Sequence, residues 1–511
     1  MRNLSVYLTA ISLAVGGTAV AELTAAVPNP TYTKDVAPII FENCASCHRE
    51  GQIGPMSLLT YQEVRPWAKS ILKNVAEGAM PPWDADHGFG PWIDDRSMSQ
   101  AEIDTIVNWV EQGAKRGNPK DMPESPVFSS SEWILGEPDY VIQFESYDVP
   151  GGGPDLFHDF IFETDLSEDK WITDVEVLPG SSEVVHHVIL WKGEQGGGNP
   201  QGWIGAWAAG AAPNQFAEGT GRMLGKNSVI RGDMHYHPTE DDHTDATRVG
   251  FHFADGPIEK ELVNLWVLNA EFKIPAGASN HEVTSKYTVL EDSHLISLTP
   301  HMHYRGKDFV YTLTYPDGKS EELLRVSDYD FNWQTEYRFE NPVAVPTGTV
   351  IDCVAHFDNS TANEANPDPT KDLTFGPESY DEMMIGFIDF VVDEGVSPSV
   401  KADPIAMKIE NLLALHPGEV YSLKVPFDPK KGMQKTALYL PKEGDGGWYI
   451  PIASFAARAA VENLVWTDND FVGTLTIPGQ PAQEFKGSIN PAAGEVTVFM
   501  RGFPLKGVLE K

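Results

Sequence analysis

The sequence predicts a multidomain chain with a small helical domain, two β-sandwiches and a C-terminal β-rich region. Three observations support this fold class. The chain has 511 residues, which suits about three or four domains. Apolar residues recur at helical spacing between residues 32 and 117, whereas short alternating runs begin at about Trp133. Glycine (45) and proline (38) are spread along the chain, as is typical of turn-rich β architecture.

The first element is an export signal. Arg2 precedes the apolar stretch Leu4–Val15, and Ala19-Val20-Ala21 forms a small-residue cleavage site. We expect residues 1–21 to be a signal peptide and the protein to be periplasmic or secreted. No later stretch reaches the roughly 18–20 apolar residues that span a bilayer, so we expect no transmembrane segment in the mature chain.

Helical patterns follow the signal. They cover Asp35–Phe41, Val64–Glu77 and Ser99–Ala114, and in the last of these Ser99 and Glu102 form a capping box. Residues 117–126 are rich in proline and polar side chains, which indicates a linker.

The β region extends over about 260 residues, enough for two sandwiches. We place their junction near residues 268–277, and expect a further β-rich region of unknown role at 396–511. The predicted strands of the sandwiches are Asp139–Phe144, Trp171–Val177, Val184–Trp191, Arg248–Phe253, Leu262–Leu268, Thr288–Leu298, Phe309–Tyr315 and Val350–Phe357.

A haem attachment motif lies in the helical region, as Cys44-Ala-Ser-Cys47-His48. In Cys-x-x-Cys-His, two thiols bind the porphyrin and the histidine binds iron. A redox dithiol would need a βαβ context, and a zinc site would need further ligands nearby. The helical region resembles class I cytochromes c, which implies a small all-α cytochrome c domain at residues 28–122 with one covalent haem c.

Two methionines are candidates for the sixth haem ligand. Met80, 32 residues after His48 and followed by a proline, is the first choice, and Met56 is the competitor. A Met/His pair favours electron transfer over oxygen chemistry.

Three histidine pairs lie in the β region, and together they predict metal binding. His301 and His303 project to the same face of a strand, so they can share an ion. The adjacent His186 and His187 can share one only if their strand bends. The third pair is His235 and His237. Imidazole suits zinc, copper, iron and nickel alike.

A thioether completes the pattern in Tyr380-Asp-Glu-Met383-Met384. The ordered motifs His-His, His-Tyr, His-x-His and Asp-Glu-Met resemble the copper type II, ascorbate-dependent monooxygenases, the peptidylglycine α-hydroxylating and dopamine β-monooxygenase family. The resemblance covers roughly residues 133–395 and extends to bacterial relatives with a fused N-terminal cytochrome c domain.

The resemblance implies two copper ions. His186, His187 and His235 match the ligands of the electron-transfer copper, with His237 as the alternative third ligand. His301, His303 and Met383 match the catalytic, oxygen-binding copper. It also implies two jelly-roll-like sandwiches, at 132–268 and 269–395. The animal relatives join their domains by disulfides, which a chain with three cysteines, two of them in the haem motif, cannot form.

The expected activity is that of a copper-dependent monooxygenase that hydroxylates a C–H bond. Its expected partners are O2, a small-molecule or peptide substrate, and an electron donor, either ascorbate or a redox protein acting through the haem. The net charge of −37 makes nucleic acid an improbable partner. Two alternatives stay open: a periplasmic cytochrome with non-catalytic sandwiches, and a zinc hydrolase using His301, His303 and Glu382.

Overall fold

A computed structural model describes most of the chain in two compact units. The first unit is Met1–Pro81 with Arg96–Pro126, and the second is Pro82–Asp95 with Val127–Lys511. The signal-peptide prediction, residues 1–21, lies outside the described residues. The described ranges are 26–50, 54–93, 95–128, 132–193, 202–208, 213–376, 378–393, 420–428, 432–440, 447–449, 459–476, 483–500 and 503–509.

The first unit is a small helical cluster. Its elements are η1 (Tyr32–Val36), α1 (Ala37–Asn43), α2 (Tyr61–Ala76), α3 (Gln100–Glu111) and η2 (Pro119–Asp121). The capping box predicted at Ser99 is present, since the Ser99 and Glu102 side chains each bond the other's backbone N–H. The core forms around Tyr32, Ile40 and Trp109, none of which is exposed.

One part of the predicted fold class is wrong. The structure does not contain the small all-α cytochrome c domain that was expected at residues 28–122. The part of the chain that the structure describes is mostly β, with 44% of residues in strands and 11% helical. In the described part of the first unit the three α-helices are short, and Gly78, Pro81 and Pro82 end the helical stretch after α2. Residues 82–95 then join the second unit.

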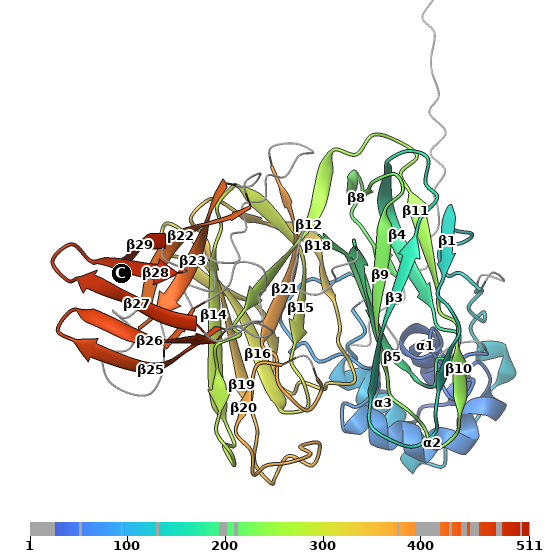
Figure 1. Cartoon of the computed structure of the whole chain (residues 1–511). Helices are drawn as coiled ribbons and strands as arrows, with labels where there is room; N and C mark the ends of the chain where they lie inside the picture. The colour runs from blue at the N-terminus through green and yellow to red at the C-terminus, as the bar shows by residue number, and fades with distance from the viewer. Residues whose placement is uncertain are drawn as a thin grey trace, which may run out of the picture. The chain divides into compact units, whose positions relative to one another are not determined.

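The first sandwich buries one core between two sheets. Val175 and Val249 of one sheet and Val188 and Met234 of the other share this core. In Figure 1 the strands β3, β5 and β9 run side by side, and the smaller sheet has the order β3-β9-β5-β6. The strands are β1 (Tyr140–Gln143), β3 (Leu156–Glu163), β4 (Lys170–Leu178), β5 (Val185–Lys192), β6 (Trp203–Ala208), β7 (Asn214–Gln215), β8 (Thr220–Leu224), β9 (Val229–Tyr236) and β11 (Arg248–Phe253), with the ribbon β2 (Tyr147–Val149) and β10 (His243–Asp245) beside them.

The second sandwich follows the same plan, with β14-β19-β16-β17 facing β12-β21-β15-β18 across a core. The predicted strand Thr288–Leu298 is instead two strands, because β14 ends at Thr288 and β15 begins at Ser293. The strands are β12 (Lys260–Leu268), β13 (Lys273–Ile274), β14 (His281–Thr288), β15 (Ser293–His301), β16 (Gly306–Thr314), β17 (Ser320–Val326), β18 (Tyr337–Val345), β19 (Val350–Phe357), β20 (Leu373–Thr374) and β21 (Ile385–Val392).

The two sandwiches share one continuous sheet. β8 of the first pairs in parallel with β12 of the second, where Thr220 and Gly221 lie opposite Lys260 and Glu261. Beside this junction an aromatic cluster combines residues of both sandwiches. It consists of Trp191, Trp203, Trp266, Leu268, Ile385 and Phe387. This packing holds the sandwiches together among the described residues without a disulfide.

Residues 82–95 extend the second sandwich. Ala85 bridges to Val326 and Trp92 to Phe339. The Trp83 and Trp92 rings both pack on Tyr337, at centroid distances of 5.1 and 5.6 Å. The stretch that directly follows Met80-Pro81 is therefore bound to the edge of the second sandwich.

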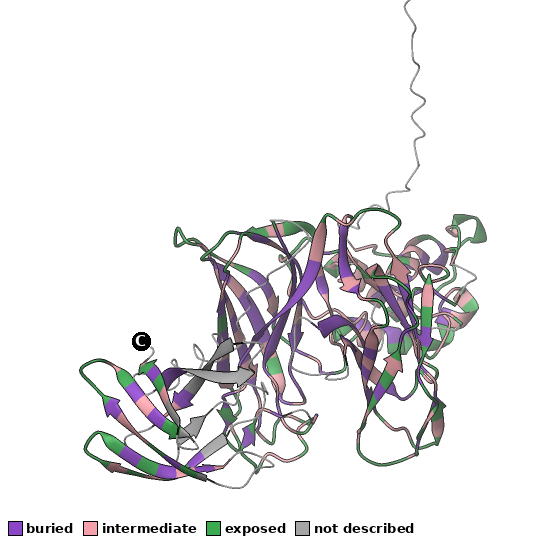
Figure 2. Ribbon diagram, turned by 45° about the horizontal axis from the view of Figure 1, so that its top comes forward, coloured by how far each residue is buried: buried purple, intermediate pink, exposed green. Residues whose placement is uncertain are grey.

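The C-terminal region is a closed barrel, β22-β23-β24-β25-β26-β27-β28-β29. Buried and exposed residues alternate along β26, as Figure 2 shows for several barrel strands. Across the described residues, no helix has both the length and the apolar character needed to cross a membrane. The barrel strands are β22 (Val420–Asp428), β23 (Gly432–Tyr439), β24 (Gly447–Tyr449), β25 (Ala459–Thr467), β26 (Asp470–Thr476), β27 (Gln483–Asn490), β28 (Glu495–Met500) and β29 (Phe503–Leu509).

Candidate metal centres

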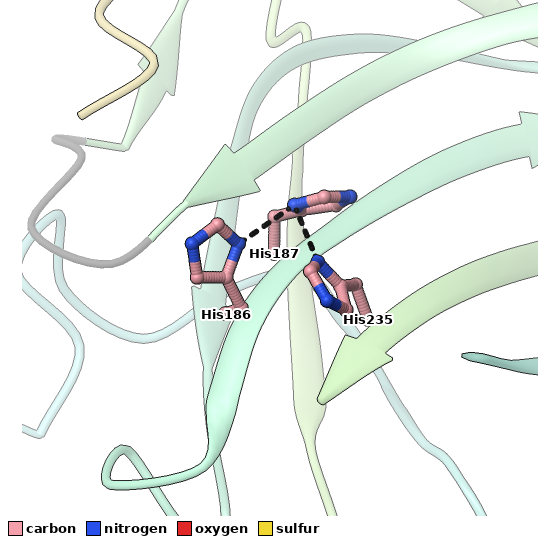
Figure 3. Close-up of side chains that lie close together, drawn as sticks. All are labelled: His186, His187 and His235. Atoms are coloured by element: carbon pink, nitrogen blue, oxygen red, sulfur yellow. Dashed lines mark hydrogen bonds between the residues drawn. The ribbon is translucent and has the colours of Figure 1, made fainter. Parts of the chain in front are cut away.

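Three histidines of the first sandwich converge on one point. His186 and His187 come from β5 and His235 from the end of β9, and one ligand atom of each lies within 4.8 Å of the others. The Nδ1 atom of His187 is 3.0 Å from Nδ1 of His186 and 3.4 Å from Nδ1 of His235. Figure 3 shows the three rings turned toward one another. We call this group the three-histidine site.

A bulge in β5 explains how adjacent histidines meet. The register of β5 against β9 shifts between Val185 and His187, and such a shift bends a strand and redirects a side chain. His187 lies directly opposite His235 in the ladder, so cross-strand pairing adds the third ring. The bend that the sequence requires for a shared ion is therefore present.

The imidazoles of His186 and His187 are held neutral. Burial, followed by the nearby His235, lowers the pKa of His186 to about 3. Burial, followed by the neighbouring imidazoles, also lowers the pKa of His187 well below its ordinary value. A neutral imidazole has a free lone pair, which is the form that binds a metal.

Asp155 and two aromatic rings hold the site from outside. Nε2 of His235 lies 2.9 Å from Oδ2 of Asp155, so a proton on Nε2 leaves the lone pair on Nδ1, facing the other rings. Phe157 stacks on His235 at a centroid distance of 4.5 Å, and Phe331 stacks on His186 at 5.0 Å. His237 instead extends to the other Asp155 oxygen at 2.8 Å, with 65% of its side chain exposed.

The second sandwich presents His301 and His303 as a close pair. Their ring centroids lie 5.3 Å apart and the ring planes are nearly perpendicular, at 89°. His301 ends β15, whereas His303 lies in the turn beyond it, so the two are not successive same-face residues of one strand. We call these two residues with Met383 the histidine–methionine site.

Each ring of this pair has a free nitrogen. Nδ1 of His301 lies 2.6 Å from Oε1 of Gln334, an amide oxygen that only accepts, so Nδ1 carries the proton and Nε2 the lone pair. Nδ1 of His303 is buried and has no hydrogen-bond partner in the described part of the chain. Burial lowers the pKa of His301 to about 4 and that of His303 well below its ordinary value.

Glu382 joins the backbone of His303 to that of Met383. One carboxylate oxygen of Glu382 accepts the backbone N–H groups of His303 (2.9 Å) and Met383 (3.3 Å), and the other accepts that of Arg305 (2.7 Å). Burial raises the pKa of Glu382 to about 8. Met383 is half-buried beside the aromatic cluster, whereas Met384 is fully buried in the sandwich core.

The haem motif lies after α1, where the N–H of His48 donates to the Cys44 carbonyl at 2.9 Å. Nδ1 of His48 is buried without a hydrogen-bond partner among the described residues. A Cβ at Gly54 would lie 2.7 Å from that nitrogen, so only glycine allows this close approach. Both thiols are free, and burial raises the pKa of Cys44 to about 12.

The contacts of Met56 and Met80 do not distinguish which of them would be the sixth haem ligand. The backbone of Met56 is a hydrogen-bond partner of the His48 ring. The backbone N–H of Met80 donates to the Asn74 carbonyl at 3.2 Å.

Cys353 and His356, both in β19, have structural surroundings. Cys353 is fully buried in the second core, and burial raises the pKa of its thiol well above the ordinary value. His356 lies between Asp308 and Glu282 of the neighbouring strands, 2.6 and 3.5 Å away.

Sequence patterns did not indicate Asp155, Phe331 or Gln334. Asp155 follows a glycine-rich turn and Gln334 lies in the turn before β18, and nothing in their local sequence distinguishes them from ordinary loop residues. Glu382 had a signal, since it adjoins Met383 in the Asp-Glu-Met motif.

Comparisons with known proteins supply no family. No family model and no curated protein matches the chain. Three solved structures align with it over 55–58% of its length: the infectious bursal disease virus Gx strain (9% identity, 89% of that chain, TM-score 0.15), the VP2 subviral particle of the same virus (9%, 88%, 0.14) and the Gt strain (10%, 90%, 0.14). TM-scores this low carry no argument about fold or function.

Proposed function

We propose that this chain is an exported copper-dependent monooxygenase that hydroxylates a C–H bond of a small molecule or peptide. The observation that carries the proposal is the convergence of His186, His187 and His235 within 4.8 Å. A second imidazole pair, 5.3 Å apart, lies in the neighbouring sandwich. Two histidine-rich sites in one unit suit a reaction that needs two electrons, because one copper ion supplies one electron per change of oxidation state.

The donor sets fit copper in two different roles. His186, His187 and His235 would hold one ion through imidazole nitrogens, which support both copper oxidation states. His301, His303 and Met383 would hold the other, and a soft thioether favours Cu(I), the state that reacts with O2. When bound, the copper pair supplies one-electron redox chemistry and oxygen activation.

The protein's own residues supply orientation. Gln334 fixes the protonated nitrogen of His301, and Asp155 does the same for His235, so one nitrogen of each ring is free for metal. Glu382 holds the His303 and Met383 main chains on one oxygen. Its oxygens accept three backbone N–H groups in all, which disfavours the zinc hydrolase alternative, because that enzyme needs this carboxylate as a metal ligand or base.

We also propose that Cys44, Cys47 and His48 hold one covalent haem c, whose iron supplies one-electron chemistry. The buried, unpartnered Nδ1 of His48 and its close contact with Gly54 support a ring held for ligation. Electrons would then enter from ascorbate or a redox protein. A pyridine haemochrome spectrum of protein matured in an exporting host tests the haem, and Cys47→Ala should alter the thioether-dependent band position.

Metal analysis and electron paramagnetic resonance test the central proposal. We expect two copper ions per chain and a type II Cu(II) signal in the oxidised protein. We also expect ascorbate-dependent O2 consumption in a screen of glycine-extended peptides, phenethylamines and small aliphatic substrates. Zinc at stoichiometric level with no copper affinity would favour the hydrolase, and haem with no bound metal would favour a cytochrome with non-catalytic sandwiches.

A further inference from the structure

A single carboxylate connects the two proposed metal centres. Asp155 lies in the first sandwich, immediately before β3, and its Oδ2 atom accepts the hydroxyl of Tyr304 at 2.9 Å. The same oxygen lies 2.9 Å from Nε2 of His235. Tyr304 directly follows His303 in the chain. Two hydrogen bonds and one peptide bond therefore join a ligand of the three-histidine site to a ligand of the histidine–methionine site.

Asp155 is a largely buried acceptor rather than a surface carboxylate. Only 13% of its side chain is exposed, and its Oδ1 atom contacts His237 at 2.8 Å. All its described partners are donors, so the carboxylate fixes their positions.

An aromatic contact runs beside this polar one. Phe331, in the turn between β17 and β18, stacks on His186 at a centroid distance of 5.0 Å. The same ring lies 6.0 Å from His303 and 4.7 Å from Tyr304. Phe331 is 8% exposed, so packing fixes its ring between residues of both centres.

We propose that Asp155 and Tyr304 couple the two centres, so that an ion at the three-histidine site raises the affinity of the histidine–methionine site for its own ion. This inference rests on the proposed function and concerns positioning residues. An ion on Nδ1 of His235 fixes the ring proton on Nε2 and strengthens its hydrogen bond to Asp155. The ordered carboxylate then holds Tyr304, and with it the His303 main chain, in the ligating position. Thermodynamic linkage requires the reverse effect to be equal.

Copper(I) binding measured with a competing chelator tests the coupling. The wild-type protein gives the overall constant for two ions, and the single-site variants His187→Ala and His301→Ala give the two separate constants. The overall constant divided by the product of the separate ones is the coupling factor. We expect a factor of about 5–30 in the wild-type protein, within the usual range for coupled sites, and about one when Tyr304→Phe is present in all three backgrounds.

Matched controls separate the link from a general effect of losing a hydroxyl. Tyr140 donates to Asp165 at 2.9 Å in the same kind of pair, away from both centres, so Tyr140→Phe should keep the wild-type factor. Asp155→Asn is a second disruptive variant and should also bring the factor near one, with circular dichroism to verify folding of each protein.

The outcomes distinguish this inference from the proposed function. Two copper ions bound with a factor of one in the wild-type protein, or a wild-type factor retained in Tyr304→Phe, would overturn the coupling and leave the monooxygenase proposal standing. A wild-type chain that binds no copper would overturn both.

Discussion

The two sandwiches bring their histidines together by different means. In the first, the backbone of a bulged strand and its ladder partner brings His186, His187 and His235 together. In the second, His303 lies beyond the end of β15, and residues outside the strands set the geometry. Gln334 contacts the His301 ring, and Glu382 accepts the backbone N–H groups of His303 and Met383. A strand ladder positions side chains through many cooperative bonds, whereas a turn depends on a few specific contacts.

We therefore expect the two sites to differ in how strongly a mutation near the ligands affects them. The three-histidine site should tolerate loss of an outer contact better than the histidine–methionine site, because its rings lie on a paired sheet. The predictions below test this contrast, starting with the largest expected effect.

Removing one ligand from each centre should abolish that centre alone. His187→Ala and His301→Ala should each reduce bound copper from two ions to one, with affinity at the altered site weakened by about 1000-fold or more. The loss should exceed the 10–100-fold that follows removal of an outer contact. Inductively coupled plasma mass spectrometry gives the stoichiometry. Loss of both ions from either variant would contradict separate centres.

Removing one ring of the aromatic cluster that joins the sandwiches should destabilise both sandwiches. Trp203 packs on Trp191 and Phe387 at 5.3 and 5.2 Å, so Trp203→Ala should lower the free energy of unfolding by about 3–5 kcal/mol. Urea denaturation followed by fluorescence measures this. The control is Trp67→Ala in α2, where the side chain is 45% exposed and the expected change is within about 0.5 kcal/mol.

Loss of the Gln334 amide should weaken one centre only. Gln334→Leu leaves Nδ1 of His301 without its acceptor, so copper affinity at the histidine–methionine site should fall by about 10-fold while the three-histidine site is unchanged. Asn332→Leu is the matched control, because this exposed amide of the same turn bonds Asp330 rather than a histidine. An equal loss at both centres would argue against the contrast between them.

A pH-dependent effect concerns residues 82–95, which extend the second sandwich. Burial, followed by the nearby Asp330, raises the pKa of Asp84 from 3.8 to about 7, with Asp328 adding to the effect. The folded pKa lies above the unfolded one, so this contribution to stability is complete below about pH 4 and is lost as pH rises through 7.

Asp84→Asn should therefore raise the unfolding free energy by about 1–3 kcal/mol at pH 8 and by little at pH 4. Thermal unfolding at both pH values measures the difference. An equal shift at the two pH values would mean that ionisation of Asp84 is not the cause.

Local pattern predicted the strands better than the domains. Alternation gives the bounds of β11 (Arg248–Phe253) and β19 (Val350–Phe357) as the structure has them. It failed at Glu291-Asp292, where a turn separates β14 from β15. The three helical patterns correspond to α1, α2 and α3, but the small all-α cytochrome c domain expected around them is not present. Residues 82–95 escaped prediction because their partners, β17 and β18, lie more than 200 positions away in sequence.

The sequence alone determined which side chains are available and how they repeat: the haem motif, the three histidine pairs, the Asp-Glu-Met segment and the alternation that makes two sandwiches. These are short-range properties, set by residue type and by the two-residue period of a strand. Only the tertiary structure decided that a bulge turns His186 and His187 to one point, that His235 rather than His237 joins them, and that Asp155 meets Tyr304. Such contacts depend on register and loop closure between distant segments, and no local pattern encodes them.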